Sequence, residues 1–191
     1  MEHRQLRERQ ANFKTREING ALHLSGYFAV FDSKYEISPR MSESIAPGAF
    51  TATLHDDIRA LTNHNTTLVL GRTTAGTLTL KEDGHGLLGD ILINKNDTDA
   101  MNTYERVKRG DVSQCSIGFT IEEESEDRRA DGSVHWTIKK IRLLEVSVCT
   151  FPAYESTGVS ARKKAPRRER RLSIAPWKWK TEMLRKLRKG R

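Results

Sequence analysis

Apolar and polar residues alternate through much of the first 150 residues, and this period of two predicts a protein built mainly from strands. Residues 21–31 are rich in aromatic and β-branched residues, and we interpret them as one bent strand or a strand pair broken at Gly26. Residues 62–93 predict three more strands, with a hairpin turn at Asp83-Gly84. Further strands are expected at 112–121, 134–141 and 143–150.

Two segments have helical spacing instead. Residues 49–58 place apolar side chains three or four positions apart, which predicts a short helix. Residues 96–110 predict a second helix, with Asp97 or Thr98 capping its start and Gly110 ending it. The pattern therefore favours an α+β fold that is mostly β, an antiparallel domain carrying at least two helices over about residues 20–155.

Charge divides the chain into three parts. Residues 1–19 form a charged leader, residues 20–160 the globular domain, and residues 161–191 a basic tail. The last 30 residues hold 14 of the 33 Lys and Arg but only 2 of the 25 Asp and Glu, so the basic character belongs to the tail. Such a block is typical of a disordered interaction arm, and its two tryptophans would suit stacking on single-stranded nucleic acid. A short amphipathic helix near its end would also suit a membrane surface or a partner protein.

Composition excludes several classes of protein. No apolar run approaches the ~20 residues that span a bilayer, and the charged start is unlike a secretory signal. Two cysteines are too few for a disulfide framework or a zinc cluster, so we expect neither a metal nor a cofactor. A reducing cytosol is the expected compartment.

The strand at 112–121 carries two candidate nucleophiles side by side. Alternation places Cys115 in the apolar row that faces the core, together with Ile117, Phe119 and Ile121. Ser116 projects from the more polar side, where Gly118 leaves room for a substrate backbone. An ordinary strand serine beside a bulge would have the same pattern.

A nucleophilic serine needs a base and a group that orients the base. Among six histidines, His64 fits best, because it is flanked by asparagines that can fix its tautomer and stands just before an apolar strand. Glu145 interrupts a strand that is apolar on both faces, so its carboxylate needs a partner. That partner is a histidine, or else Arg142 or Arg72, unless the carboxylate is exposed at a sheet edge.

Five segments occur in a specific order and spacing: GYFAVFDS at 26–33, ESIAPGAF at 43–50, NHN and LGR within 63–72, VKRGDVSQCSIGF at 107–119, and LLEVSVCTFPAY at 143–154. Together they make the chain resemble, over roughly residues 15–160, the prohead maturation proteases of tailed bacteriophages. The resemblance implies a serine endopeptidase related in fold to the herpesvirus assembly proteases. That fold is a closed antiparallel β-barrel surrounded by helices.

The resemblance also implies roles for the candidate residues. Ser116 would be the nucleophile, His64 the base and Glu145 the third member of the triad. Many relatives have an acidic residue after the histidine, where this chain has asparagine. The related viral enzymes use a second histidine at the third position, so His135 and His85 are alternatives there. Backbone N–H groups are expected to bind the oxyanion, with the Arg72 side chain as a further candidate.

The resemblance implies partners and a place of action as well. The expected substrates are the major capsid protein with its scaffolding segment, and the protease itself. Portal protein and a second copy of the chain are further candidate partners, inside the assembling procapsid in the host cytoplasm. The competing hypothesis is a nucleic-acid-binding or assembly factor driven by the basic tail, with an inert β domain.

Overall fold

The computed structural model describes residues 5–10 and 13–150. The basic tail predicted at 161–191, with its expected contact to nucleic acid, lies outside these residues. Within them the protein is mostly β, as predicted, with one helix. The elements in chain order are β1 (Gln5–Gln10), β2 (Lys14–Ile18), β3 (Ala21–Val30), β4 (Tyr35–Ser38), β5 (Met41–Ile45), β6 (Arg59–Thr62), β7 (Asn65–Arg72), β8 (Leu78–Glu82), β9 (Gly86–Ile93), α1 (Thr98–Arg109), β10 (Gln114–Arg128) and β11 (Val134–Cys149).

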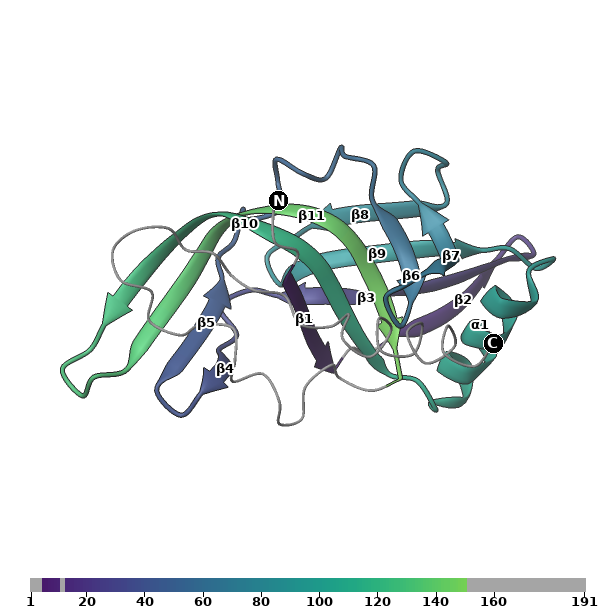
Figure 1. The fold of residues 1–191 in the computed structure, drawn as a ribbon. Coiled ribbons are helices and arrows are strands. Elements are labelled where there is room, and N and C mark those ends of the chain that lie inside the picture. Colours follow the sequence, from purple (N-terminus) through teal and green to yellow (C-terminus); the bar gives the residue numbers. More distant parts are fainter. Residues whose placement is uncertain (1–4, 11–12, 151–191) are drawn as a thin grey trace, which may run out of the picture.

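The strands form two sheets around a shared core (Figure 1). The larger has the order β1-β10-β11-β5-β4, and β6, with β7 beside it, also pairs with β11. The smaller has the order β2-β3-β9-β8. Both sheets contribute large apolar side chains to one core cluster, among them Phe28, Ile91, Phe119 and Val146. Burial of these residues is the main stabilising contribution to the fold.

The expected closed antiparallel barrel surrounded by helices is not what the described residues form. No strand pairing joins the edges of the two sheets into a ring among them, and α1 is the single helix there. The larger sheet is also mixed, because β11 runs parallel to both β5 and β6. A barrel requires every edge strand to find a partner, whereas here β2 and β8 end one sheet and β1 and β4 end the longest path of the other.

Residues that sequence reasoning placed in the charged leader take part in both sheets. β1 pairs antiparallel with β10, and β2 pairs antiparallel with β3. Neither segment has a hydrophobic pattern of its own, and each is an edge strand. Pairing with an apolar neighbour therefore determines their conformation, which a single-strand pattern does not reveal.

The acidic segment at 122–132, between the strands predicted at 112–121 and 134–141, is also mostly strand. β10 continues to Arg128 and pairs with β11 from Val134 onward. The strands predicted at 134–141 and 143–150 are likewise one strand, β11. Figure 1 shows this hairpin extending beyond the rest of the molecule, with β5 and β4 beside its outer half. The acidic residues in this outer part of β10 are largely exposed. They therefore do not alternate with apolar residues, and the sequence lacks the usual pattern of a strand there.

A β-bulge in β11 decides the face on which Glu145 lies. Phe119 of β10 pairs with Leu143, but the preceding Gly118 pairs with Glu145, so Leu144 is an extra residue. Before the bulge Leu143 faces the core, and after it the core residues are Val146 and Val148. The bulge thus turns Glu145 to the face opposite the core row.

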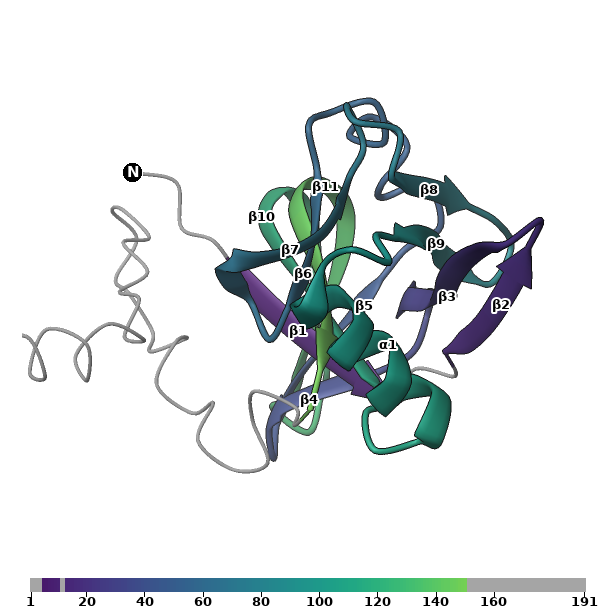
Figure 2. The same cartoon turned by 90° about the vertical axis from the view of Figure 1, so that its right-hand side faces the viewer.

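The helix predicted at 96–110 is confirmed as α1. The Asp97 side chain accepts hydrogen bonds from the backbone N–H groups of Asp99 and Ala100, and Gly110 ends the helix with φ of 87°. Figure 2, viewed from this end, shows α1 across the ends of the sheets, where it contacts β2, β7 and β9. The helix contributes Tyr104 to the core.

The helix predicted at 49–58 is wrong, because this segment is a series of turns. The Thr53 and Asp56 N–H groups donate to carbonyls three residues earlier rather than four. The Thr53 hydroxyl also accepts from the Leu143 N–H at 3.0 Å, and the Ala49 carbonyl accepts from the Ile141 N–H at 2.9 Å. These bonds hold the segment against β11, so its apolar spacing serves packing without a regular helix.

Candidate active site

His64 lies in the two-residue turn that joins β6 to β7. Asn63 and His64 have positive φ values of 50° and 57°, which suit a tight hairpin turn and which asparagine tolerates well. The Asn63 N–H donates to the Val148 carbonyl at 2.9 Å, and its side-chain oxygen accepts from the Thr150 N–H at 2.9 Å. The turn is thereby fixed to the end of β11 and carries the imidazole toward that strand.

The imidazole is hydrogen-bonded to Glu145. His64 Nδ1 lies 2.6 Å from Glu145 Oε1, and the Glu145 side chain is only 4% exposed. The carboxylate that sequence analysis left without an assigned partner therefore pairs with the histidine. A buried carboxylate that accepts the Nδ1 proton fixes the tautomer in which Nε2 carries no proton and can act as a base.

Ser147 completes this arrangement, and sequence reasoning missed it. Its hydroxyl donates to Glu145 Oε2 at 2.6 Å and accepts from the His64 backbone N–H at 3.2 Å. The hydroxyl thus orients the carboxylate and the turn together. The sequence contained a signal for this contact: Ser147 comes two residues after Glu145, and alternate residues of a strand lie on the same face of the sheet.

Ser116 lies on the same face of the sheet, one strand away. Its Cα pairs with that of Ser147 across the β10–β11 ladder, while Cys115 lies in the core row as predicted. Ser116 is fully buried, and its hydroxyl has no hydrogen-bond partner in the described part of the chain. His64 Nε2 instead lies 3.9 Å from Cys149 Sγ. In this structure His64 is thus hydrogen-bonded to Glu145, whereas no hydrogen bond joins it to the Ser116 hydroxyl.

The two alternative histidines are engaged elsewhere. His135 is hydrogen-bonded to Ser42 and Ser44 of β5, at 2.9 and 3.0 Å. His85 contacts the ring of Tyr27 edge-on, with 4.5 Å between ring centroids. Neither arrangement brings a second imidazole to His64, and Glu145 occupies Nδ1.

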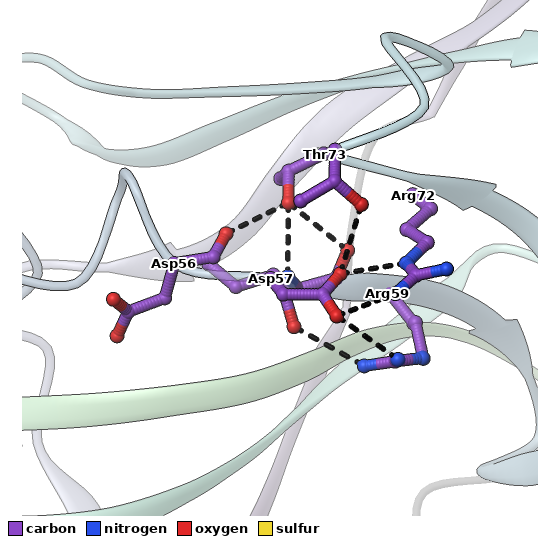
Figure 3. A network of polar contacts seen from close by, with 7 residues as sticks. Asp56, Asp57, Arg59, Arg72 and Thr73 are labelled. Carbon is purple, nitrogen blue, oxygen red and sulfur yellow. Dashed lines mark hydrogen bonds and ion pairs between the residues drawn. The ribbon is translucent and has the colours of Figure 1, made fainter.

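Arg72 belongs to a separate polar network (Figure 3). Its guanidinium binds both oxygens of Asp57 at 2.7 Å, and Arg59 and Thr74 also donate to that carboxylate. The hydrogen bonds from Arg72 hold the pKa of Asp57 well below its usual range, and the carboxylate in turn raises the pKa of Arg72. The donors of Arg72 are directed at Asp57, which leaves it a poor candidate for an oxyanion.

The described residues contain neither a cluster of metal ligands nor a helix that could span a membrane. Within 5–10 and 13–150, no three His, Cys, Asp or Glu side chains gather as metal ligands would. The helix α1 has 12 residues, and no helix in this part of the chain is long and apolar enough to cross a bilayer.

Comparison with known proteins gives matches of three kinds: to a family model, to a curated protein and to a solved structure. A family model described as Caudovirus prohead serine protease matches residues 9–170. The prohead protease of Enterobacteria phage HK97 is 28% identical over 156 residues, which cover 80% of this chain and 67% of that protein. Among solved structures, the bacteriophage T4 capsid assembly protease, gp21, superposes with a TM-score of 0.54 at 8% identity, over 78% of this chain and 98% of that one. This last match concerns the fold alone.

Proposed function

Because the chain belongs to the Caudovirus prohead serine protease family, a family of capsid maturation, we propose that Ser116, His64 and Glu145 are its catalytic triad. The observation that carries this proposal is the His64–Glu145 hydrogen bond on the face that also bears Ser116. The chain is a serine protease, so one serine must be placed beside a base. Ser116 is the serine of the neighbouring strand whose hydroxyl is buried and unpaired among the described residues.

In the proposed reaction, Ser116 Oγ attacks the scissile carbonyl carbon while His64 Nε2 takes the hydroxyl proton. Glu145 stabilises the imidazolium that forms. Breakdown of the tetrahedral intermediate breaks the C–N bond, and the imidazolium gives its proton to the leaving amine. Water, deprotonated by the same nitrogen, then hydrolyses the acyl-enzyme and restores Ser116. For these steps to occur, the imidazole of His64 must move so that Nε2 turns from Cys149 toward Ser116 when substrate binds.

The proposed substrates are the major capsid protein, cut at its scaffolding segment, and the protease itself. Portal protein and a second copy of the chain are proposed as further partners inside the procapsid, within the host cytoplasm. Membership in a prohead protease family supports this choice, since such a protease must act on proteins enclosed with it during assembly.

The test is a serine-to-alanine substitution with a neighbouring serine as control. Ser116→Ala should lower cleavage of co-expressed capsid protein by at least about 10⁴-fold, because no nucleophile remains. Ser113→Ala, at an exposed position three residues earlier, should cleave at the wild-type rate. Gel analysis and intact-mass measurement give both rates. Normal cleavage by Ser116→Ala would remove Ser116 from the mechanism.

A cysteine nucleophile is the one rival that a contact favours. Cys149 Sγ lies 3.9 Å from His64 Nε2, so Cys149, His64 and Glu145 also form a continuous line. Labelling separates the two: a fluorophosphonate should modify Ser116 and leave Cys149 unmodified. The family supports the serine, because its members are serine proteases.

A further inference from the structure

The strand that carries Ser116 has a neighbour on each side, and the two differ in kind. On one side β11 provides the His64–Glu145 face over a long ladder. On the other side lies β1, a strand of six residues from the start of the chain (Figure 1). β1 runs antiparallel to β10 from Gln5 opposite Phe119 to Gln10 opposite Gln114. This register places the backbone of Glu8 directly opposite Ser116.

This placement matters because a protease acts on extended backbone. A peptide that adds to a sheet edge as a strand gains main-chain hydrogen bonds whatever its sequence, and its register fixes which carbonyl faces the nucleophile. The edge of β10 occupied by β1 is the edge from which an added strand would reach Ser116. In the described arrangement Ser116 has no exposed surface, so a polypeptide from another molecule cannot reach it.

We propose that this edge of β10, residues 114–119, is the substrate-binding surface, and that it takes an extended polypeptide as an antiparallel strand in place of β1. The inference rests on Ser116 being the nucleophile. β1 then acts as a resident occupant that keeps the edge closed until it leaves. Its sequence, QLRERQ, has a single apolar residue, so little hydrophobic surface is available to hold it there.

The sequence of β1 also indicates what kind of edge this is. Charged edge strands are common where a sheet must avoid pairing with other chains. Here the charged strand covers the one place in the larger sheet where, under the proposed mechanism, pairing with another chain is required. Exchange of β1 for substrate converts a protected edge into a binding site without any change in the β10–β11 ladder.

The experiment removes the ability of β1 to pair while keeping the rest of the chain. The double substitution Arg7→Pro with Glu8→Pro removes two successive backbone N–H groups. Because the N–H groups of successive residues in a strand point to opposite sides, one of these two must face β10. Arg7→Ala with Glu8→Ala changes the same side chains but keeps both N–H groups, and is the matched control. A chain beginning at Phe13 is the second variant, and thermal unfolding checks that all forms fold.

The readout is the rate at which a fluorophosphonate labels Ser116, located by peptide mass spectrometry. If the open form is populated at 10% or less, as minor states commonly are, freeing the edge should raise the rate about tenfold or more. The proline variant and the Phe13 chain should show this rise, and the alanine control should not. Adding the peptide QLRERQ to the Phe13 chain should slow labelling again, whereas QLPPRQ should not.

Hydrogen exchange at residues 114–119 confirms in parallel that the edge is open. Faster exchange in the proline variant with unchanged labelling would overturn the substrate-edge inference and leave the proposed function standing. If Ser116 is not labelled in any form, including the Phe13 chain, the nucleophile assignment itself is wrong and the inference is lost with it.

Discussion

Replacing Glu145 with glutamine tests the part of the site that the structure describes most completely. The carboxylate makes two hydrogen bonds of 2.6 Å, one with His64 Nδ1 and one from the Ser147 hydroxyl. Glutamine has the same shape, but one of its two terminal atoms is a donor. If the NH₂ faces His64, the imidazole must accept at Nδ1 and carry its proton on Nε2, where it cannot act as a base.

The magnitude follows from these two losses. A hydrogen bond to a charged group is worth about 1.5–3 kcal/mol, which corresponds to a factor of about 10–150 in rate. A wrong histidine tautomer costs up to about 10⁴ in the best-studied triad. We therefore expect Glu145→Gln to lower kcat by a factor between about 10² and 10⁴. Ser147→Ala removes a single bond to the carboxylate, and a loss of about tenfold is expected.

Rates of capsid-protein cleavage and of fluorophosphonate labelling provide the assay. Glu82→Gln is the matched control, since Glu82 also accepts two hydrogen bonds of 2.6 Å, from the Gly48 N–H and the Thr51 hydroxyl. Glu82 belongs to β8 of the smaller sheet, whereas Ser116 and Glu145 lie in the larger one. It should cleave at the wild-type rate. Should Glu145→Gln keep more than a third of wild-type activity while His64→Ala is inactive, the idea that Glu145 orients the base is refuted.

Three further predictions follow from other contacts. Cys149→Ala should retain activity within about threefold, because the thiol is only a weak partner of His64 Nε2; loss comparable to that of Ser116→Ala would favour the cysteine mechanism. Asp97→Ala should lower the free energy of unfolding by about 1 kcal/mol in urea titration, whereas Asp97→Asn, which still caps α1, should change it little. Arg72 lowers the pKa of Asp57, so this pair stabilises the fold above the ordinary carboxyl pKa of about 4 and the contribution is lost as pH falls below it. Wild-type urea midpoints should therefore fall more steeply with acid than those of Asp57→Asn, and parallel curves would contradict this.

Local signals in the sequence were sufficient for several elements. α1 was predicted with its cap at Asp97 or Thr98 and its end at Gly110, because both signals act within one turn of the helix, and the structure has the cap at Asp97. The hairpin at Asp83-Gly84 was also predicted, since it joins β8 to β9 through a short turn. The core position of Cys115 followed from alternation alone. Each of these features depends on residues close together in the chain.

Other features depended on pairing between distant segments. β1 and β2 are charged and become strands through their neighbours, and the acidic stretch after Ile121 forms a ladder outside the core. The turns at 49–58 have helical spacing, but bonds to β11 hold them in another conformation. A pattern of apolar residues indicates which side chains are buried. It does not indicate which distant segment will provide the hydrogen-bond partners for the backbone N–H and C=O groups.

The residues proposed for catalysis were named from the sequence, by residue type, flanking residues and family resemblance. Their relation in space was decided by the tertiary structure. The bulge at Leu144 reverses the alternation of β11, so Glu145 leaves the core row and meets His64 from a turn about 80 residues away. Alternation in a single strand cannot reveal an inserted residue, because the shift in register exists only relative to the paired strand β10.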